Sequence, residues 1–219
     1  MELFLFDIDG TLIESPRRAG RRALERACQE TLGIEAAAEG ISFDGKTDPL
    51  IVEEIFRARR GRTPSPAELS EVLSSYLRCL DGELLHDDAV RVLPSVEESL
   101  ARLRARAAMV GLATGNVEDG ARRKLTRAGL WSHFAFGGYG SDAADRGELV
   151  RMALRRADER SAQPIARDRA WVVGDTPRDI HAAHAAGIRA IGVATGGFTE
   201  DELRAAGADR VLSTLADLA

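Results

Sequence analysis

The sequence predicts an α/β protein with a parallel sheet flanked by helices and an all-helical domain inserted near its start. Two observations lead to this prediction. Over residues 91–219, short apolar runs that suit strands buried on both faces alternate with helical segments. Residues 15–90 carry helical patterns and no convincing strand. We therefore assign residues 1–14 and 91–219 to the core and residues 15–90 to the inserted domain.

The chain begins with an apolar run at residues 3–6, which ends at Asp7 and suits a buried strand. Ser15 is followed by a proline, a pair that predicts the start of a helix because serine is a good N-cap and proline fits the first helical turn. Glycines and prolines then divide the stretch up to residue 90 into several helices.

Beyond residue 91 the strands and helices alternate. Ser95 with Glu98 predicts a capping box that opens a helix, and Thr199 with Glu202 predicts another. We expect strands at residues 109–113, 133–136, 170–173, 190–193 and 210–212, and helices at residues 116–128, 145–160 and 177–186.

Composition and charge argue against several classes of protein. The net charge is −5 and the arginine runs are interleaved with apolar or acidic residues, so we expect no nucleic-acid partner. No stretch is long and apolar enough to cross a membrane. Cys28 and Cys79 lack metal-ligand spacing and suit reduced thiols. These features predict a cytoplasmic protein, a monomer or homodimer.

Polar residues follow three of the expected strands at their carboxyl ends. Asp7 and Asp9 follow the first strand, Thr114 follows residues 109–113, and Asp175 follows residues 170–173. Arg146 begins the helix after a glycine-rich loop. In an open α/β sheet ligands bind beyond the carboxyl ends of the strands, so these side chains are expected to converge there.

Three segments carry a resemblance to a known family. FDIDGTL at residues 6–12, MVGLATGN at residues 109–116 and WVVGDTPRDI at residues 171–180 resemble the first, second and fourth motifs of the haloacid dehalogenase superfamily. The inserted domain is similar to the type-one helical cap of its phosphoglycolate phosphatase and β-phosphoglucomutase-like branch. The resemblance spans the whole chain and implies a Rossmann-like core.

The resemblance implies a role for each catalytic candidate. Asp7 would attack phosphorus and form an aspartyl-phosphate, and Asp9 would serve as general acid and base. Thr114 would donate its hydroxyl to a phosphoryl oxygen. The family normally has a lysine in its third motif, whereas this chain offers Arg146, with a simple exposed arginine as the alternative. The nearest upstream lysine, Lys124, falls within the helix after the second motif.

The resemblance also implies a metal site for Mg²⁺, which prefers oxygen ligands. The ligands would be the Asp7 carboxylate, the Asp9 backbone carbonyl and the Asp175 carboxylate. Asp179 would hold a bound water or orient its neighbours. The substrate-binding candidates are Gly10, Thr11, Gly115, Asn116 and, from the inserted domain, Lys46, for which an exposed surface lysine is the simpler interpretation.

Together these features predict a Mg²⁺-dependent phosphatase that hydrolyses a small phosphorylated metabolite, with phosphoglycolate as the first substrate to try. One alternative is a phosphomutase of the β-phosphoglucomutase type, which would pass the phosphoryl group to a sugar. Another is a phosphate-binding module without turnover, for which the arginine in the third motif would be the cause. The retained carboxylates argue against that last alternative.

Overall fold

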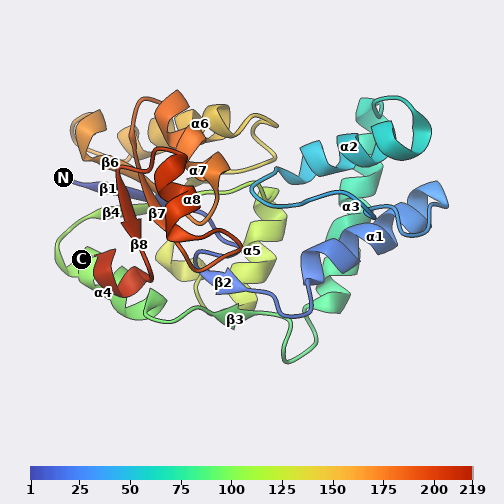
Figure 1. Cartoon of the computed structure of the whole chain (residues 1–219), viewed down its shortest axis with the longest axis horizontal. Coiled ribbons are helices and arrows are strands. Elements are labelled where there is room, and N and C mark those ends of the chain that lie inside the picture. The colour runs from blue at the N-terminus through green and yellow to red at the C-terminus, as the bar shows by residue number, and fades with distance from the viewer. Residues whose placement is uncertain (219) are drawn as a thin grey trace.

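The computed structural model describes residues 1–218, and its centre is a six-stranded sheet (Figure 1). The strand order is β5-β4-β1-β6-β7-β8, and every neighbouring pair is parallel. The strands are β1 (Leu3–Phe6), β4 (Met109–Ala113), β5 (Gly137–Gly138), β6 (Ala170–Gly174), β7 (Arg189–Val193) and β8 (Arg210–Leu212). The predicted α/β class with a parallel, Rossmann-like sheet is confirmed.

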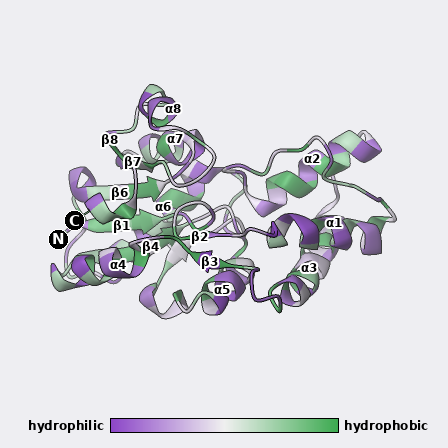
Figure 2. Ribbon diagram, turned by 60° about the horizontal axis from the view of Figure 1, so that its bottom comes forward, coloured by the Kyte–Doolittle hydropathy of each residue, from purple (hydrophilic) through white to green (hydrophobic). Residues whose placement is uncertain are grey.

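Helices cover both faces of this sheet (Figure 2). Alternate residues of β1 pack on opposite sides of it. Leu3 and Leu5 pack with the buried faces of α6 (Arg146–Asp158), α7 (Pro177–Ala185) and α8 (Glu200–Ala205). Phe4 and Phe6 pack with α4 (Val96–Ala105), α5 (Glu118–Arg127) and η3 (Leu215–Leu218). A strand enclosed in this way explains why residues 3–6 are all apolar.

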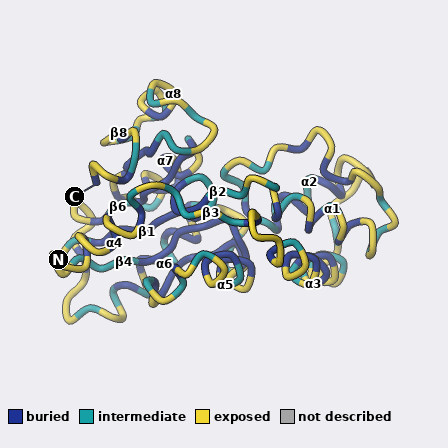
Figure 3. The backbone as a smooth tube through the Cα atoms, turned by 90° about the horizontal axis from the view of Figure 1, so that it is seen from below, coloured by how far each residue is buried: buried dark blue, intermediate teal, exposed yellow. Residues whose placement is uncertain are grey.

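Three helices form a separate unit at the far end of the molecule from both termini (Figure 1). They are α1 (Ala19–Leu32), α2 (Asp48–Arg60) and α3 (Pro66–Glu83), and their inner faces share one apolar cluster. Figure 3 shows buried residues gathered along the sheet and, apart from them, along these inner faces. We call α1–α3 the helical unit.

A short antiparallel ribbon joins the two chain segments that lead into and out of the helical unit. It consists of β2 (Ile13–Glu14) and β3 (Arg91–Val92), paired as Ile13 with Val92 and Glu14 with Arg91. The sequence does not predict this ribbon, because two-residue strands are too short to show a periodic pattern.

One predicted helix start and one predicted capping box are wrong. The first helix begins at Ala19 instead of at Ser15, because Arg18 adopts a left-handed φ of 51°. The Ser15 hydroxyl accepts a hydrogen bond from the Ala19 N–H and donates one to the Ala89 carbonyl. Ser95 precedes α4 as expected, but it lies at φ 63° and makes no side-chain cap bond, so the predicted capping box is absent.

The expected strand at residues 133–136 is also wrong. The chain instead forms the short helix η1 (Trp131–His133), and β5 consists of the glycines that follow. A side chain on Gly138 would collide with the Leu149 carbonyl, so α6 can approach the strand only because this residue is glycine. The apolar residues before the glycines misled the strand prediction.

Other features agree with the sequence analysis. The capping box of Thr199 and Glu202 opens α8 as predicted, and η2 (Arg167–Arg169) precedes β6. Cys28 and Cys79 are both buried free thiols. Within residues 1–218, no helix combines the length and apolar character needed to span a membrane.

Candidate active site

The candidate site lies at the carboxyl ends of three adjacent strands, β4, β1 and β6. Asp7 follows β1, Thr114 follows β4 and Asp175 follows β6. The chain builds outward from β1 in one direction through β4 and β5, then in the other through β6, so these residues lie at the switch point of the sheet. A pocket of about 450 Å³ opens there, between the strand ends and the helical unit.

Three buried carboxylates meet on one side of the pocket. The ligand oxygens of Asp7, Asp175 and Asp179 all lie within 4.8 Å of one another, and we call this group the acid cluster. Thr176 fixes Asp179 at the start of α7, because its backbone N–H and hydroxyl donate to Asp179 Oδ2 at 3.0 and 2.7 Å. The Thr11 hydroxyl donates to Asp175 Oδ1 at 3.0 Å.

The acid cluster carries more negative charge than its surroundings compensate. Burial and the neighbouring Asp179 raise the pKa of Asp7 to about 7, although Arg146 opposes this shift. Burial, Asp179 and Asp7 raise the pKa of Asp175 well above its usual range. Closely packed carboxylates of this kind suit a hard divalent cation with oxygen ligands, so a metal fits the residues present.

Arg146 is the cation beside the acid cluster. It is the first residue of α6, its Nη2 pairs with Asp179, and the same nitrogen lies 3.5 Å from Asp7 Oδ1. Its Nη1 donates to the Gly45 carbonyl at 3.0 Å. The Nε of Arg146 is buried and has no hydrogen-bond partner within residues 1–218.

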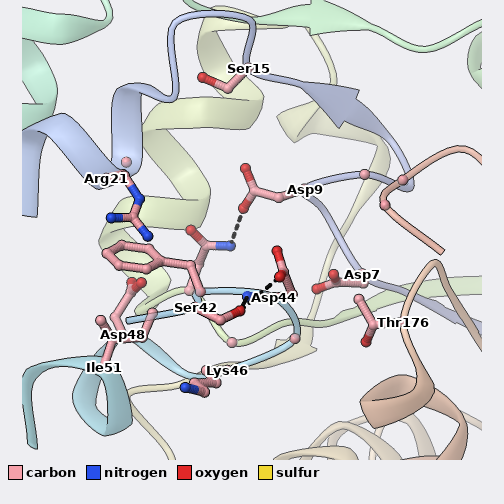
Figure 4. A pocket seen from close by; sticks show the side chains of 18 of the residues that line it. Asp7, Asp9, Ser15, Arg21, Ser42, Asp44, Lys46, Asp48, Ile51 and Thr176 are labelled. Atoms are coloured by element: carbon pink, nitrogen blue, oxygen red, sulfur yellow. Dashed lines mark hydrogen bonds between the residues drawn. The ribbon is translucent and has the colours of Figure 1, made fainter. Parts of the chain in front are cut away.

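Asp9 lies in a different environment, although it is two residues from Asp7. Its carboxylate accepts from Lys124 Nζ at 2.7 and 2.9 Å and from Asn116 Nδ2 at 2.8 Å. Burial acts to raise the pKa of Asp9, but the charge of Lys124 and the hydrogen bonds from Lys124 and Asn116 together outweigh burial, and the net pKa is lowered. In Figure 4 the Asp9 and Asp7 carboxylates point to different parts of the pocket.

Lys124, which the sequence places within the helix after the second motif and without a predicted role, lies at the site. Its side chain is only 8% exposed, and Nζ also donates to Asn116 Oδ1 at 2.7 Å. The signal was present in the periodicity of α5, because Lys124 shares the buried face of that helix with Ala121 and Leu125. A lysine on the apolar face of a helix needs a buried acidic partner, and Asp9 is that partner.

The structure places the other candidates at different depths. Thr114 is fully buried, and its Oγ1 accepts from the Asn116 Nδ2 and N–H at 2.9 and 3.3 Å. Gly10 lines the pocket at φ 85°, and a side chain there would collide with the Asp175 carboxylate. Thr11, expected to contact substrate, is instead fully buried and directed at Asp175.

Lys46 lines the pocket from the side of the helical unit (Figure 4). Its ammonium pairs with Glu54 Oε2 at 2.5 Å, and the side chain is only 11% exposed, unlike a free surface lysine. A side chain on Gly115 would collide with the Lys46 carbonyl, so the backbone of Lys46 lies directly against the second motif. Most of the predicted residues therefore line one pocket, whereas Thr11, Thr114 and Asp179 are buried and are not among its lining residues.

The fold and the pocket together define an α/β enzyme with a carboxylate-rich site at the switch point of its sheet. A family profile described as haloacid dehalogenase-like hydrolase matches residues 4–193, and the chain belongs to this family. The predicted membership is thereby confirmed.

Relatives and solved structures are similar over nearly the full chain. A phosphoglycolate phosphatase of Synechococcus elongatus is 29% identical over 227 residues, covering 100% of this chain and 95% of that protein. A phosphoserine phosphatase of Thermus thermophilus is 38% identical, covering 83% and 68%. The structure of CbbY from Rhodobacter sphaeroides in complex with phosphate has a TM-score of 0.76 at 22% identity and covers 100% and 96%. The chain is accordingly a phosphoric monoester hydrolase.

Proposed function

We propose that the protein is a Mg²⁺-dependent phosphatase that hydrolyses a small phosphorylated metabolite through an aspartyl-phosphate on Asp7. One observation carries this proposal. The Asp7 carboxylate lies in the pocket at the end of β1, next to the Asp175 and Asp179 carboxylates and 3.5 Å from the Arg146 guanidinium. This arrangement supplies a nucleophile and cationic groups for a phosphoryl group at one point.

The acid cluster would hold the metal through Asp7 and Asp175, together with the backbone carbonyl of Asp9, and Asp179 would orient a bound water or its neighbours. When bound, Mg²⁺ supplies positive charge that reduces the repulsion between the nucleophile and the phosphoryl oxygens. Arg146 would add a second cation beside the nucleophile, because its Nη2 lies 3.5 Å from Asp7 Oδ1.

The reaction would proceed in two displacements. An Asp7 oxygen forms a bond to phosphorus as the bond to the ester oxygen breaks, and Asp9, which must take up a proton before this step, gives that proton to the leaving oxygen. Asp9 then takes a proton from a water, which attacks phosphorus and releases Asp7 and inorganic phosphate. Lys124 and Asn116 would orient Asp9 for both transfers, because both donate to its carboxylate.

Residues 15–90 would act as the cap domain over this reaction. They contribute Lys46 and other residues of the pocket wall, so closing them over the strand ends would exclude water. A pocket of about 450 Å³ suits a small ester better than a phosphoprotein. Phosphoglycolate is the first substrate to test, given the relatives of that name. The cytoplasmic location and the monomer or homodimer state stay predictions.

The test is phosphate release from a panel of small phosphate esters with and without Mg²⁺, comparing the wild type with Asp7→Asn. Mg²⁺-dependent release that the substitution abolishes would support the proposal. Transfer of the phosphoryl group between glucose phosphates without net hydrolysis would favour a phosphomutase. Mg²⁺-dependent phosphate binding without any turnover would favour a binding module. Release that survives Asp7→Asn would mean that Asp7 is not the nucleophile.

A further inference from the structure

Helix α5 begins without a cap of its own. Its N-cap residue is Val117, whose side chain cannot accept a hydrogen bond, yet the first four N–H groups of a helix have no partner inside it. The Val117 N–H instead donates to Asp48 Oδ2 at 2.9 Å, and the Glu118 N–H donates to the Ser141 hydroxyl at 3.2 Å. Asp48 belongs to the helical unit, 69 residues earlier in the chain.

The Asp48 carboxylate is not needed to cap its own helix, because Thr47 already caps α2, so it can accept a hydrogen bond from α5. α2 begins after Thr47, whose hydroxyl accepts from the Leu50 N–H at 3.3 Å. The Asp48 backbone also faces the core, since its N–H donates to the Gly115 carbonyl at 2.8 Å. One residue of the helical unit thus bonds to both sides of Asn116, which contacts Asp9.

We propose that Asp48 is a positioning residue that caps α5 from the helical unit and thereby holds that unit against the catalytic loop of residues 114–117. The catalytic part of this inference rests on the proposed function, because it assumes that Asp9 and its partners take part in phosphate release. The structural part, capping of one helix by a residue of another unit, does not depend on it.

Neighbouring contacts support this role. The Thr47 hydroxyl donates to the Ala144 carbonyl at 3.1 Å, and Arg146 Nη1 donates to the Gly45 carbonyl at 3.0 Å. Residues 45–48 therefore form a docking segment that bonds to both loops flanking the pocket. Within it, Asp48 is the acidic side chain that accepts from a helix N-terminus, where a negative charge is most favourable.

Fixing the start of α5 also affects Lys124, which lies two turns further along that helix and pairs with Asp9. A helix that frays at its N-terminus would let the loop before it and the lysine within it move. Asp48 therefore links the position of the helical unit to the position of the general acid and base. Through Asp48, the position of the helical unit over the pocket would therefore affect the positions of Lys124 and Asp9.

The test compares Asp48→Ala and Asp48→Asn with a matched control, Asp119→Ala. Asp119 is an exposed acidic residue in the first turn of the same helix α5, so its removal reports any general effect of charge on that helix. Hydrogen exchange of the whole unliganded protein would be followed for the amides of residues 115–121. In parallel, kcat and KM would be measured on the best ester of the panel.

In Asp48→Ala, we expect these amides to exchange about tenfold faster or more, the loss expected for a hydrogen bond to a charged acceptor. KM should rise and kcat should fall. Asp48→Asn retains an acceptor, so its amides should exchange about as slowly as those of the wild type. The same is expected of the control, Asp119→Ala. Unchanged exchange in Asp48→Ala, or equal effects of the Ala and Asn variants, would overturn the proposal. If the wild type releases no phosphate, the exchange result alone decides the capping role.

Discussion

The two sides of the pocket shift the pKa of a carboxyl group in opposite directions. On one side Asp7 lies among other buried acids, and its pKa is raised to about 7. On the other side Asp9 bonds to a buried lysine, and its pKa is lowered. These residues are two positions apart on one loop, so their difference comes from the elements that face them.

This difference separates two tasks. The side of Asp7 has an excess of negative charge that a cation would relieve, whereas the side of Asp9 is already balanced by Lys124. Environments that push the pKa values of two acids apart commonly assign them different chemical roles. We therefore expect substitutions on the two sides to affect metal affinity and proton transfer separately.

The largest expected effect comes from Asp9→Asn. Loss of a general acid and base typically reduces turnover by roughly 10²–10⁴-fold. Because the Asp9 side chain lies outside the acid cluster, the affinity for Mg²⁺ should change little. Initial rates and calorimetric titration with Mg²⁺ would measure the two quantities, with Asp7→Asn as the contrasting variant. A comparable loss of Mg²⁺ affinity in both variants would contradict the separation.

A smaller effect is expected from Lys124→Met. Without the ammonium, the pKa of Asp9 should rise, and the limb of the pH–rate profile that reports this group should move to higher pH. The loss of an orienting partner should lower kcat by about 10–100-fold. Lys124→Arg, which keeps the charge, is the control. An unshifted profile in Lys124→Met would show that the pair does not set the ionisation of Asp9.

The pH dependence of stability should report on the side of the pocket that holds Asp7 and the acid cluster. The folded-state pKa of Asp7 is raised above its unfolded value, so its contribution is present below about pH 4 and is lost as pH rises towards about 7. In metal-free protein we therefore expect the unfolding free energy to fall steadily across that range. Urea denaturation in EDTA at several pH values would measure it.

The same denaturation series on Asp7→Asn is the control, because it removes the titrating group while keeping the shape. The difference between the two proteins should shrink when Mg²⁺ is added, since a bound cation stabilises the ionised carboxylates. A difference that is independent of pH in metal-free protein would contradict the raised pKa.

The smallest expected effect comes from Thr11→Val, which removes the hydrogen bond from the hydroxyl to Asp175 Oδ1. A bond of this kind contributes about 1–2 kcal/mol, so Mg²⁺ affinity should fall by about 5–30-fold while the charge of the acid cluster is unchanged. Calorimetric titration would test this. Unaltered Mg²⁺ affinity would show that Asp175 is held in place without Thr11.

The fold could be predicted because its core strands are apolar throughout and lie between helical segments. The errors arose where local conformation departs from what residue type suggests. Ser95 is a good cap residue, but its left-handed backbone turns the side chain away from the helix. Gly137 and Gly138 are poor strand residues, yet they form β5, and α6 packs directly on Gly138.

The candidate site could be predicted where it follows strand ends, as for Asp7, Thr114 and Asp175. Contacts between distant segments could not be predicted, because no local sequence pattern indicates them. Lys124 pairs with Asp9 across 115 positions of the chain, and Asp48 caps α5 from another unit. Thr11 shows the converse, since a residue inside a recognisable motif supports Asp175 from behind.

The ribbon of β2 and β3 would also constrain the movement of the helical unit if that unit acts as the proposed cap. Its two connecting segments leave the core side by side, tied by pairing of Ile13 with Val92 and by the bond from the Leu93 N–H to the Leu12 carbonyl. Two independent tethers would allow twisting and sliding, whereas paired tethers behave as a single strip. Bending of that strip leaves essentially one axis of rotation, so each opening of the unit would return the docking segment to the same place.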